Sequence, residues 1–414
     1  MGRMFSVLGI SICVLAGSMA ADEGKVHSGV PRLDHVFVIM MENHSYLQIA
    51  NNPNAPFANA MARSANVATN YFAIAHPSLT NYLEVVGGSN FGVLSDNNPD
   101  WNNAGCITNL ATGTTNTDNP ASPNVCPIWG VGTDAPTPKF DTSNETTPPA
   151  ITSVTNIDGV SPAIPAARTV GKTIGDQLVE HGMSWKSYQE SLPPGGAAGV
   201  NFSDGFFTDA SNIPSILPGE AQGLVKLYAA KHNPFVYFRS VQEGADPRNS
   251  LRNVVGFAGS HGLFDDLASG RVPSLSFIAP NQCNDQHGRG NAGPACDFDP
   301  NDDGTQNHLN PALIYQGDLT LRTLVKAIHD SPAWQEGHNA IVVLWDENDY
   351  SATPNTNQVM LIVDTNHRAR RVQSGRFYTH FSLLKTLDAG FGLPCLNHAC
   401  DPGVNLMDDL FGDR

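Results

Sequence analysis

The sequence predicts an α/β fold in which a mainly parallel β-sheet is sandwiched between helices. Short apolar runs without polar alternation occur at 35–41, 273–279 and 340–345, as expected of strands that are buried on both faces. Segments with apolar residues three or four positions apart lie between these runs. Strands that alternate with helices form a mainly parallel sheet with helices on both sides.

Helical periodicity appears in four segments, at 55–65, 171–182, 220–232 and 318–331. Asp318 opens the last of them and is expected to be its N-cap. Two stretches lack periodicity and are expected to be loop insertions: 91–168, rich in Asn, Thr, Pro and Asp, and 288–312, rich in Gly, Asn and Asp. No internal repeat or tandem linker divides the chain, so one domain over 21–414 is expected.

The N-terminal segment 1–20 has the features of a secretory signal peptide. Arg3 supplies positive charge, an apolar stretch follows, and small residues precede Ala21, as at a cleavage site. We therefore expect a secreted or periplasmic protein. No other stretch approaches ~20 apolar residues, so no membrane span is expected.

Six cysteines follow the segment 1–20, and they fall into three close pairs. In an oxidising compartment an even number of cysteines indicates disulfides. Pairing between nearest neighbours is expected, although zinc binding is an alternative that the absence of Cys-x-x-Cys spacing disfavours. The expected pairs are Cys106–Cys126, Cys283–Cys296 and Cys395–Cys400.

The formal net charge of −16 for 414 residues argues against a nucleic-acid partner, because a phosphate backbone would be repelled. The same excess of carboxylates is compatible with cation binding.

Each of the three apolar runs is followed at once by a polar cluster. Because the carboxyl ends of parallel strands meet at one edge of a sheet, ligands collect there. The clusters contain Glu42 and Asn43 after the first run; Asn281, Asn284, Asp285 and His287 after the second; and Asp346 and Glu347 after the third.

Carboxylate and amide oxygens are hard ligands, so Ca²⁺, Mg²⁺ or Mn²⁺ is favoured as the bound metal. Zinc remains an alternative, since His287 and His380 are available to join. A cation would also keep closely packed carboxylates ionised.

Ser78 directly precedes a helical pattern formed by Leu79, Tyr82, Leu83 and Val86. The simplest interpretation is a helix N-cap. The alternative is a nucleophile at a helix N-terminus, where unpaired N–H groups favour a phosphate and a metal would activate the hydroxyl. Asn81 lies three residues on and shares the face of Ser78, whereas the rival hydroxyl of Thr80 points elsewhere.

The chain carries a series of motifs that resembles the bacterial phosphoesterase family, which contains secreted acid phosphatases and phospholipases C. The family is similar in turn to the alkaline phosphatase superfamily. The motifs are "HVFVIMMENHSY", "APF", "HPSLTNYLEVVGG", "FIAPNQCNDQHG", "YQGD", "VVLWDEND" and "YTHFSLLKTLDAGFGLP", in this order.

The resemblance implies an alkaline phosphatase-like fold and a metal-dependent phosphohydrolase that works through a phosphoserine. Ser78 stands at the nucleophile, Asn81 at the amide that contacts the phosphoryl group, and His287 at a histidine that would protonate the leaving oxygen. The positions of the family's metal ligands carry Glu42, Asn43, Asp346 and Glu347.

The chain departs from this pattern in two respects. Members with two zinc ions have Asp-x-x-x-His and Asp-His pairs, whereas here Asn281-x-x-x-Asp285 and Asp346-Glu347 occur, which favours one hard cation. The glycine-rich run of the phospholipase branch is also absent after Asp346, so the acid phosphatase branch is nearer.

Other residues have both a structural and a functional interpretation. His380 opens the last helix and either reaches the site or packs, and His44 and His76 adjoin motifs. The sequence DPNDDG resembles half of a calcium loop, with Asp299, Asn301 and Asp303 as ligands and a polar turn as the alternative.

The expected function is that of a secreted acid phosphatase acting on a small phosphorylated substrate. A phospholipase C-type phosphodiesterase and a non-catalytic secreted metal-binding protein are the alternatives.

Overall fold

The computed structural model describes most of the chain outside four long segments, 1–23, 100–124, 133–168 and 193–212. The described residues are 24, 26–74, 76–93, 96, 98–99, 125–132, 169–192, 213–214, 224–225, 227–289, 292–299, 305–348, 357–367 and 371–412. Several predictions fall outside them, namely the signal peptide, most of the 91–168 insertion, Cys106, Asn301 and Asp303.

A nine-stranded sheet forms the centre of the fold, with strand order β12-β2-β11-β10-β1-β9-β5-β8 and β13 paired with β2. The three predicted strands are neighbours, because β1 pairs in parallel with both β10 and β9. Only β11 runs antiparallel to the strands beside it, β10 and β2. The strands are β1 (His35–Met41), β2 (Asn66–Phe72), β5 (Trp185–Gln189), β8 (Val254–Gly256), β9 (Leu275–Ala279), β10 (Asn339–Trp345), β11 (Gln358–Thr365), β12 (Gln373–Ser374) and β13 (Tyr378–Thr379).

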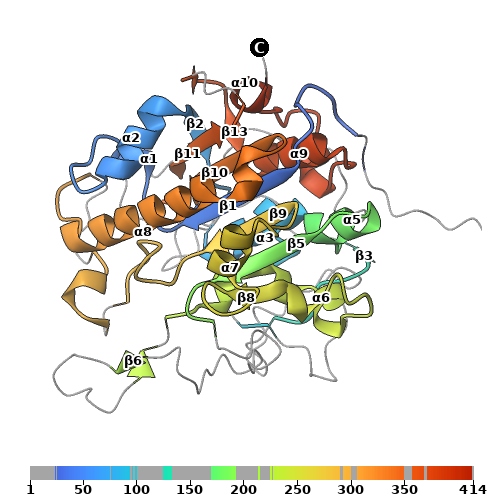
Figure 1. Cartoon of the computed structure of the whole chain (residues 1–414), viewed down its shortest axis with the longest axis horizontal. Coiled ribbons are helices and arrows are strands. Elements are labelled where there is room, and N and C mark those ends of the chain that lie inside the picture. Colours follow the sequence, from blue (N-terminus) through green and yellow to red (C-terminus); the bar gives the residue numbers. More distant parts are fainter. Residues whose placement is uncertain are drawn as a thin grey trace, which may run out of the picture.

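Two groups of helices flank the sheet. In Figure 1 the long helix α8 crosses the front of the sheet, and it packs against α2 and α7. Helices α3, α5 and α9 pack against one another as the second group. The α-helices are α1 (Tyr46–Ile49), α2 (Pro56–Ser64), α3 (Ser78–Gly87), α5 (Ile174–Glu180), α6 (Arg239–Glu243), α7 (Leu263–Ser269), α8 (Pro311–Asp330), α9 (His380–Phe391) and α10 (Asp408–Phe411).

Short elements complete the described part of the chain. Two small hairpins pair β3 with β4 and β6 with β7. These strands and the 3₁₀-helices are β3 (Val131–Gly132), β4 (Thr169–Val170), β6 (Ile213–Pro214), β7 (Leu224–Val225), η4 (Ala230–His232), η5 (Pro234–Tyr237), η6 (Leu251–Asn253), η8 (Pro294–Cys296), η9 (Pro332–Gln335) and η10 (Asn397–Cys400).

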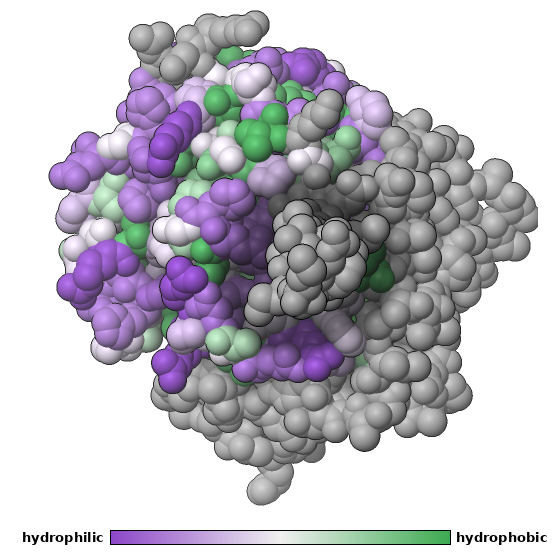
Figure 2. Space-filling model, turned by 90° about the vertical axis from the view of Figure 1, so that its right-hand side faces the viewer, coloured by the Kyte–Doolittle hydropathy of each residue, from purple (hydrophilic) through white to green (hydrophobic). Residues whose placement is uncertain are grey.

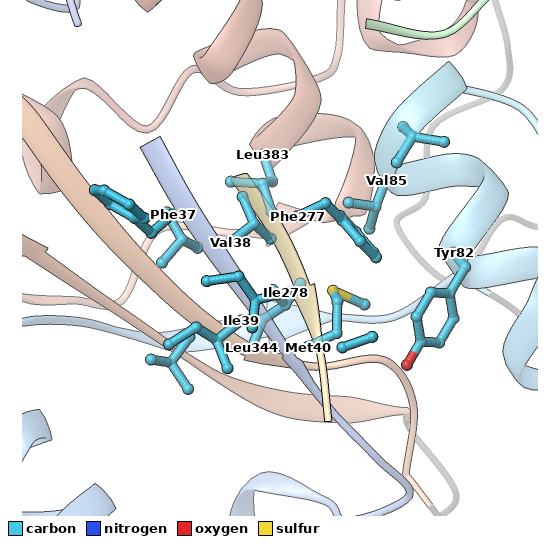
Figure 3. Close-up of a cluster of buried hydrophobic side chains, with 14 of the residues drawn as sticks. Phe37, Val38, Ile39, Met40, Tyr82, Val85, Phe277, Ile278, Leu344 and Leu383 are labelled. Carbon is cyan, nitrogen blue, oxygen red and sulfur yellow. The ribbon is translucent and has the colours of Figure 1, made fainter. Parts of the chain in front are cut away.

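The hydrophobic core joins both faces of the sheet to the helices. Residues 36–41 of β1 and all of β10 are buried, which explains their uninterrupted apolar sequences. Figure 3 shows Tyr82 and Val85 of α3 projecting toward Phe277 of β9 and Met40 of β1. This packing fixes the start of α3 beside the carboxyl ends of the central strands.

The predicted helix at 220–232 is wrong. Of its described residues, 224–225 form strand β7, and Ala230–His232 form a 3₁₀ turn. Between them the carbonyl of Leu227 accepts a hydrogen bond from Gln282 N (3.1 Å), and the Leu227 side chain packs on Cys283 and Cys296. These contacts hold Leu227 against the 281–296 loop, so tertiary packing overrides the helical periodicity of the segment.

Asp318 is also not the cap that the sequence suggested. Helix α8 begins earlier, at Pro311, and Asn310 is its N-cap. The Asp318 carboxylate instead accepts hydrogen bonds from Phe57 N (2.9 Å) and Ala58 N (2.8 Å). Asp318 therefore caps helix α2, whose own N-cap residue makes no side-chain hydrogen bond.

Two of the predicted disulfides are present, Cys283–Cys296 and Cys395–Cys400. Among the described residues, no helix is long and apolar enough to cross a bilayer. On the face that Figure 2 shows, hydrophilic side chains cover much of the described surface, with hydrophobic ones scattered among them.

Candidate active site

The polar clusters that follow the three central strands meet at one edge of the sheet. Two backbone hydrogen bonds join them: Glu42 N donates to Asp285 O (2.8 Å), and Asp346 N donates to Met41 O (2.9 Å). The side chains of Glu42, Asp285 and Asp346 are fully or almost fully buried. Carboxylates that follow three strands thus form one buried cluster.

Asn43 turns the chain sharply at the end of β1. Its φ of +48° lies in the left-handed region, which asparagine tolerates better than most residues. In this conformation Asn43 N donates to Asp346 Oδ1 (3.1 Å). The other oxygens, Asn43 Oδ1 and Asp346 Oδ2, are buried and accept no hydrogen bond from any described residue. Two unsatisfied hard oxygens beside further carboxylates fit a divalent cation.

Ser78 is the first residue of α3, and its hydroxyl does not cap the helix. It donates instead toward Glu42 Oε2 (3.2 Å) and Glu347 Oε1 (3.1 Å). The cap interpretation is therefore wrong for this serine. The rival hydroxyl of Thr80 is occupied elsewhere, because it donates to the carbonyl of Pro77 (2.6 Å).

Asn81 and Glu347 lie next to each other on one side of the site. Asn81 Nδ2 donates to Glu347 Oε2 (2.8 Å), and Asn81 Oδ1 accepts from Ile74 N (3.2 Å). His76 Nδ1 lies 3.0 Å from the same Glu347 oxygen, and His76 Nε2 lies 2.8 Å from Asn348 Oδ1. Glu347 thus connects the serine to Asn81 and to His76.

Tyr82 and His232 hold the other side of Glu42. The hydroxyl of Tyr82 donates to Glu42 Oε1 (2.5 Å), and His232 Nε2 lies 3.1 Å from the same oxygen. The second ring nitrogen of His232 lies 3.1 Å from Asp285 Oδ2. The rings of Tyr82 and His232 are stacked, with centroids 5.3 Å apart, so the position of Glu42 is fixed by a packed aromatic pair.

Lys231 brings a positive charge to the same place. Its Nζ lies 3.3 Å from Ser78 Oγ, 2.7 Å from Asp96 Oδ2 and 3.0 Å from His287 Nε2. Burial, together with the charge of Lys231, lowers the pKa of His287 to about 3. The imidazole of His287 is therefore neutral near pH 7.

Burial raises the pKa of each of the three central carboxyl groups, and neighbouring carboxylates raise it further. The strongest neighbour is Asp346 for Glu42, Glu42 for Asp285, and Glu347 for Asp346. A site that concentrates negative charge in this way favours a cation. The ligand atoms of Glu42, His232 and His287 also lie within 4.8 Å of one another.

Three of the predicted residues lie behind the site or beside it. His380 is buried, with Nε2 2.7 Å from the carbonyl of Asp346 and Nδ1 2.8 Å from the hydroxyl of Tyr71. Asn281 N and Asn284 Nδ2 both donate to Glu190. These three residues support the loops that carry the central carboxylates.

Asp299 belongs to the predicted calcium loop and is buried. Its Oδ2 lies 2.9 Å from His44 Nε2, whose Nδ1 lies 3.0 Å from the carbonyl of Glu42. With Asn301 and Asp303 outside the described residues, calcium binding by this loop stays a prediction.

Several residues of the site were not anticipated, namely Tyr82, Asp96, Lys231 and His232. Tyr82 was assigned to the core face of α3, where its ring does lie. Lys231 and His232 were assigned to a helix that does not form. The adjacent pair Lys231-His232, two titratable residues directly after the apolar run 227–230, was the available signal for them.

The family profile described as "Phosphoesterase family" matches residues 47–394. The chain belongs to this family. Three relatives are named phosphatases. An acid phosphatase of Aspergillus fumigatus is 23% identical over 90% of this chain and 58% of its own length. A phosphatidylinositol-3-phosphatase of Mycobacterium tuberculosis is 23% identical over 99% of this chain and 96% of its own. A phosphate-repressible acid phosphatase of Penicillium chrysogenum is 24% identical over 90% of this chain and 62% of its own.

The chain spans about three fifths of the length of the two fungal phosphatases. Among solved structures, a protein of the alkaline phosphatase superfamily from Vibrio parahaemolyticus is similar over 90% of this chain and 69% of its own length. It has a TM-score of 0.42 and 13% sequence identity.

Proposed function

We propose that this protein is a secreted, metal-dependent phosphatase that hydrolyses phosphomonoesters through a phosphoserine at Ser78. The observation that carries the proposal is the position of the Ser78 hydroxyl. It lies at the start of a helix, within 3.3 Å of two carboxylates and one ammonium group. Family membership and the relatives named acid phosphatase support the reaction class. The two disulfides support an oxidising compartment.

The residues that would hold the metal are Glu42, Asn43, Asp346 and Glu347. All four offer oxygen atoms, so a hard cation such as Mg²⁺, Mn²⁺ or Ca²⁺ fits this set better than zinc. When bound, the cation supplies positive charge to the serine oxygen and to the phosphoryl group. The buried oxygens of Asn43 and Asp346 that accept no hydrogen bond from the described residues support this placement.

The proposed reaction consists of two displacements at phosphorus, which form and then hydrolyse the phosphoserine. In the first, Ser78 Oγ attacks phosphorus, its proton passes to a carboxylate that it already contacts, and the bond from phosphorus to the alcohol oxygen breaks, with that oxygen taking up a proton from solvent. In the second, water attacks phosphorus and gives up one proton to solvent, the bond from phosphorus to Ser78 Oγ breaks, and the carboxylate returns its proton to Oγ. Asn81 Nδ2, one helical turn from Ser78, donates to a phosphoryl oxygen in both steps. Nδ1 of the neutral His287 ring donates to the carbonyl of Gly288 (2.9 Å), so Nε2 carries no proton and accepts from Lys231.

The test compares a phosphomonoester with a phosphodiester. We expect the purified protein to hydrolyse p-nitrophenyl phosphate but not bis(p-nitrophenyl) phosphate, with activity lost on chelation and restored by one divalent cation. Ser78→Ala should lower kcat by about 10⁴-fold or more, while Ser64→Ala on helix α2 leaves it unchanged.

Two outcomes would replace the proposal. Preference for the diester would favour a phospholipase C-type phosphodiesterase. Metal binding without turnover of either ester would favour a non-catalytic metal-binding protein.

A further inference from the structure

Lys231 lies against the reacting oxygen, and its three N–H groups have three acceptors. The distances from Nζ are 2.7 Å to Asp96 Oδ2, 3.0 Å to His287 Nε2 and 3.3 Å to Ser78 Oγ. An ammonium group has three donors and no acceptor. The orientation of the ammonium group is therefore fully determined by these partners.

Asp96 connects Lys231 to the helix that carries the serine. Asp96 Oδ1 accepts a hydrogen bond from Leu79 N (3.0 Å), in the first turn of α3, while Oδ2 pairs with Lys231. One carboxylate thus joins the backbone next to Ser78 to the ammonium group. This arrangement places Nζ next to Ser78 Oγ.

Lys231 keeps its charge in this environment. Burial alone would lower the pKa of the ammonium group, but the charges of Asp96 and Glu42 outweigh burial and raise it. A permanently charged donor in a largely water-free site interacts strongly with a developing oxyanion, because its dipole and charge need no reorganisation.

We propose that Lys231 is a further catalytic residue of this site and stabilises the negative charge on Ser78 Oγ in both displacements. The proposal rests on the phosphoserine mechanism proposed above. In the first displacement the Oγ–P bond forms and the bond from phosphorus to the alcohol oxygen breaks. In the second, the bond from water oxygen to phosphorus forms, water gives up a proton to solvent, the P–Oγ bond breaks with its electron pair on Oγ, and Oγ regains a proton from the neighbouring carboxyl group. Lys231 remains protonated and donates one hydrogen bond to Oγ throughout.

Geometry separates this role from assistance to the leaving alcohol. In an in-line displacement the leaving oxygen lies opposite the nucleophile, on the far side of phosphorus. A group in contact with Oγ is therefore beside the nucleophile in the first step and beside the leaving atom only in the second. Loss of Lys231 should slow both steps, and its effect on the first should not depend on the alcohol.

The experiment measures both steps in Lys231→Met by rapid quench, with a series of aryl phosphates whose leaving groups differ in pKa. We expect formation and hydrolysis of the phosphoserine each to slow by about 10²–10³-fold, as when an oxyanion donor is removed. The loss in the first step should be equal across the series. Lys231→Arg, which keeps the charge but moves it, should show a smaller loss with the same pattern.

Lys186→Met is the matched control, because Lys186 also pairs with a buried aspartate, Asp266, but lies on β5 away from Ser78. It should retain wild-type rates. Wild-type rates in Lys231→Met, or a loss that grows with the leaving-group pKa, would overturn the role of Lys231 at Oγ. If Lys231→Met does not fold, the same two results in Lys231→Arg decide the question. A wild-type protein that hydrolyses no monoester would instead overturn the proposed function.

Discussion

Ser78 and Glu347 are 269 residues apart in the sequence, yet Ser78 Oγ donates to Glu347 Oε1 over 3.1 Å. The second oxygen of the same carboxylate accepts from Asn81, one helical turn further along α3. One glutamate from the end of β10 therefore aligns two residues of α3 at the site. The position of this helix against the strand ends determines the chemistry that the site can perform.

Asp346→Asn should stabilise the metal-free protein and weaken its binding of the metal. Burial and Glu347 raise the pKa of Asp346, and a carboxyl group whose pKa is raised in the folded state destabilises the fold when it is ionised above that pKa. The neutral amide should therefore raise the Tm of the metal-free protein near pH 7. It should also weaken metal binding by at least about 10-fold.

Differential scanning calorimetry with and without Mn²⁺ measures both effects. Asp330→Asn, at the exposed end of α8, is the control and should change neither. An unchanged metal-induced shift in Tm in Asp346→Asn would remove this residue from the ligand set.

His380→Phe should weaken metal binding without removing a ligand. The ring of His380 holds the carbonyl of Asp346 at 2.7 Å, and burial lowers its pKa to about 4, so it acts as a neutral donor near pH 7. Loss of such a supporting hydrogen bond lowers metal affinity by about 10-fold or more. Calorimetric titration with Mn²⁺ measures the change. Tyr71→Phe removes only the hydroxyl that contacts His380 Nδ1, so it should weaken metal binding less. An equal effect of the two variants would contradict the role of the hydrogen bond from His380 to Asp346.

Removal of the Cys283–Cys296 disulfide should destabilise the protein and impair the site. It closes a loop of 13 residues that carries Asp285 and His287, and loop-closure entropy assigns such a bridge about 3 kcal/mol. Cys395–Cys400 closes a loop of 5 and should contribute about 2 kcal/mol. Urea unfolding of the two double Cys→Ser variants tests this. We expect a lower kcat only for the variant that lacks Cys283–Cys296. Equal kcat values in the two variants would show that this disulfide does not affect the site.

Asp318→Ala should destabilise helix α2 from a distance. The Asp318 side chain is the acceptor for two N–H groups in the first turn of α2, and loss of a cap costs about 1 kcal/mol or somewhat more. Urea unfolding measures the change. Asp330→Ala removes only an exposed pair with Lys326 and should cost less than about 0.5 kcal/mol. Equal losses would show that the capping bonds contribute nothing.

The central sheet and most of the carboxylate cluster were predictable because their signals are local. Continuous apolar runs identify strands buried on both faces, and the polar residues that follow them must lie at one edge when the strands are parallel neighbours. Glu42 and Asp346 were found in this way. Asn284 was predicted by the same argument, but its side chain contacts Glu190. The argument predicts where a loop lies and does not predict the direction of its side chains.

The other residues of the site are positioned by tertiary contacts, which the spacing of apolar residues does not predict. Lys231 and His232 lie in the 3₁₀-helix η4, which follows the contacts of Leu227 with the 281–296 loop and is not part of an α-helix. Asp96 reaches the start of α3 from the region assigned to an insertion. Each of these contacts joins residues far apart in the chain, so no local pattern contains them.

The most direct test of the account is the covalent state of Ser78 during turnover. The protein is mixed with p-nitrophenyl phosphate, quenched in acid within milliseconds, digested and analysed by mass spectrometry. The account predicts a phosphoryl group on Ser78 in the wild-type protein and none in Ser78→Ala. Hydrolysis at full rate with an unmodified Ser78, or a phosphoryl group on another residue, would contradict it.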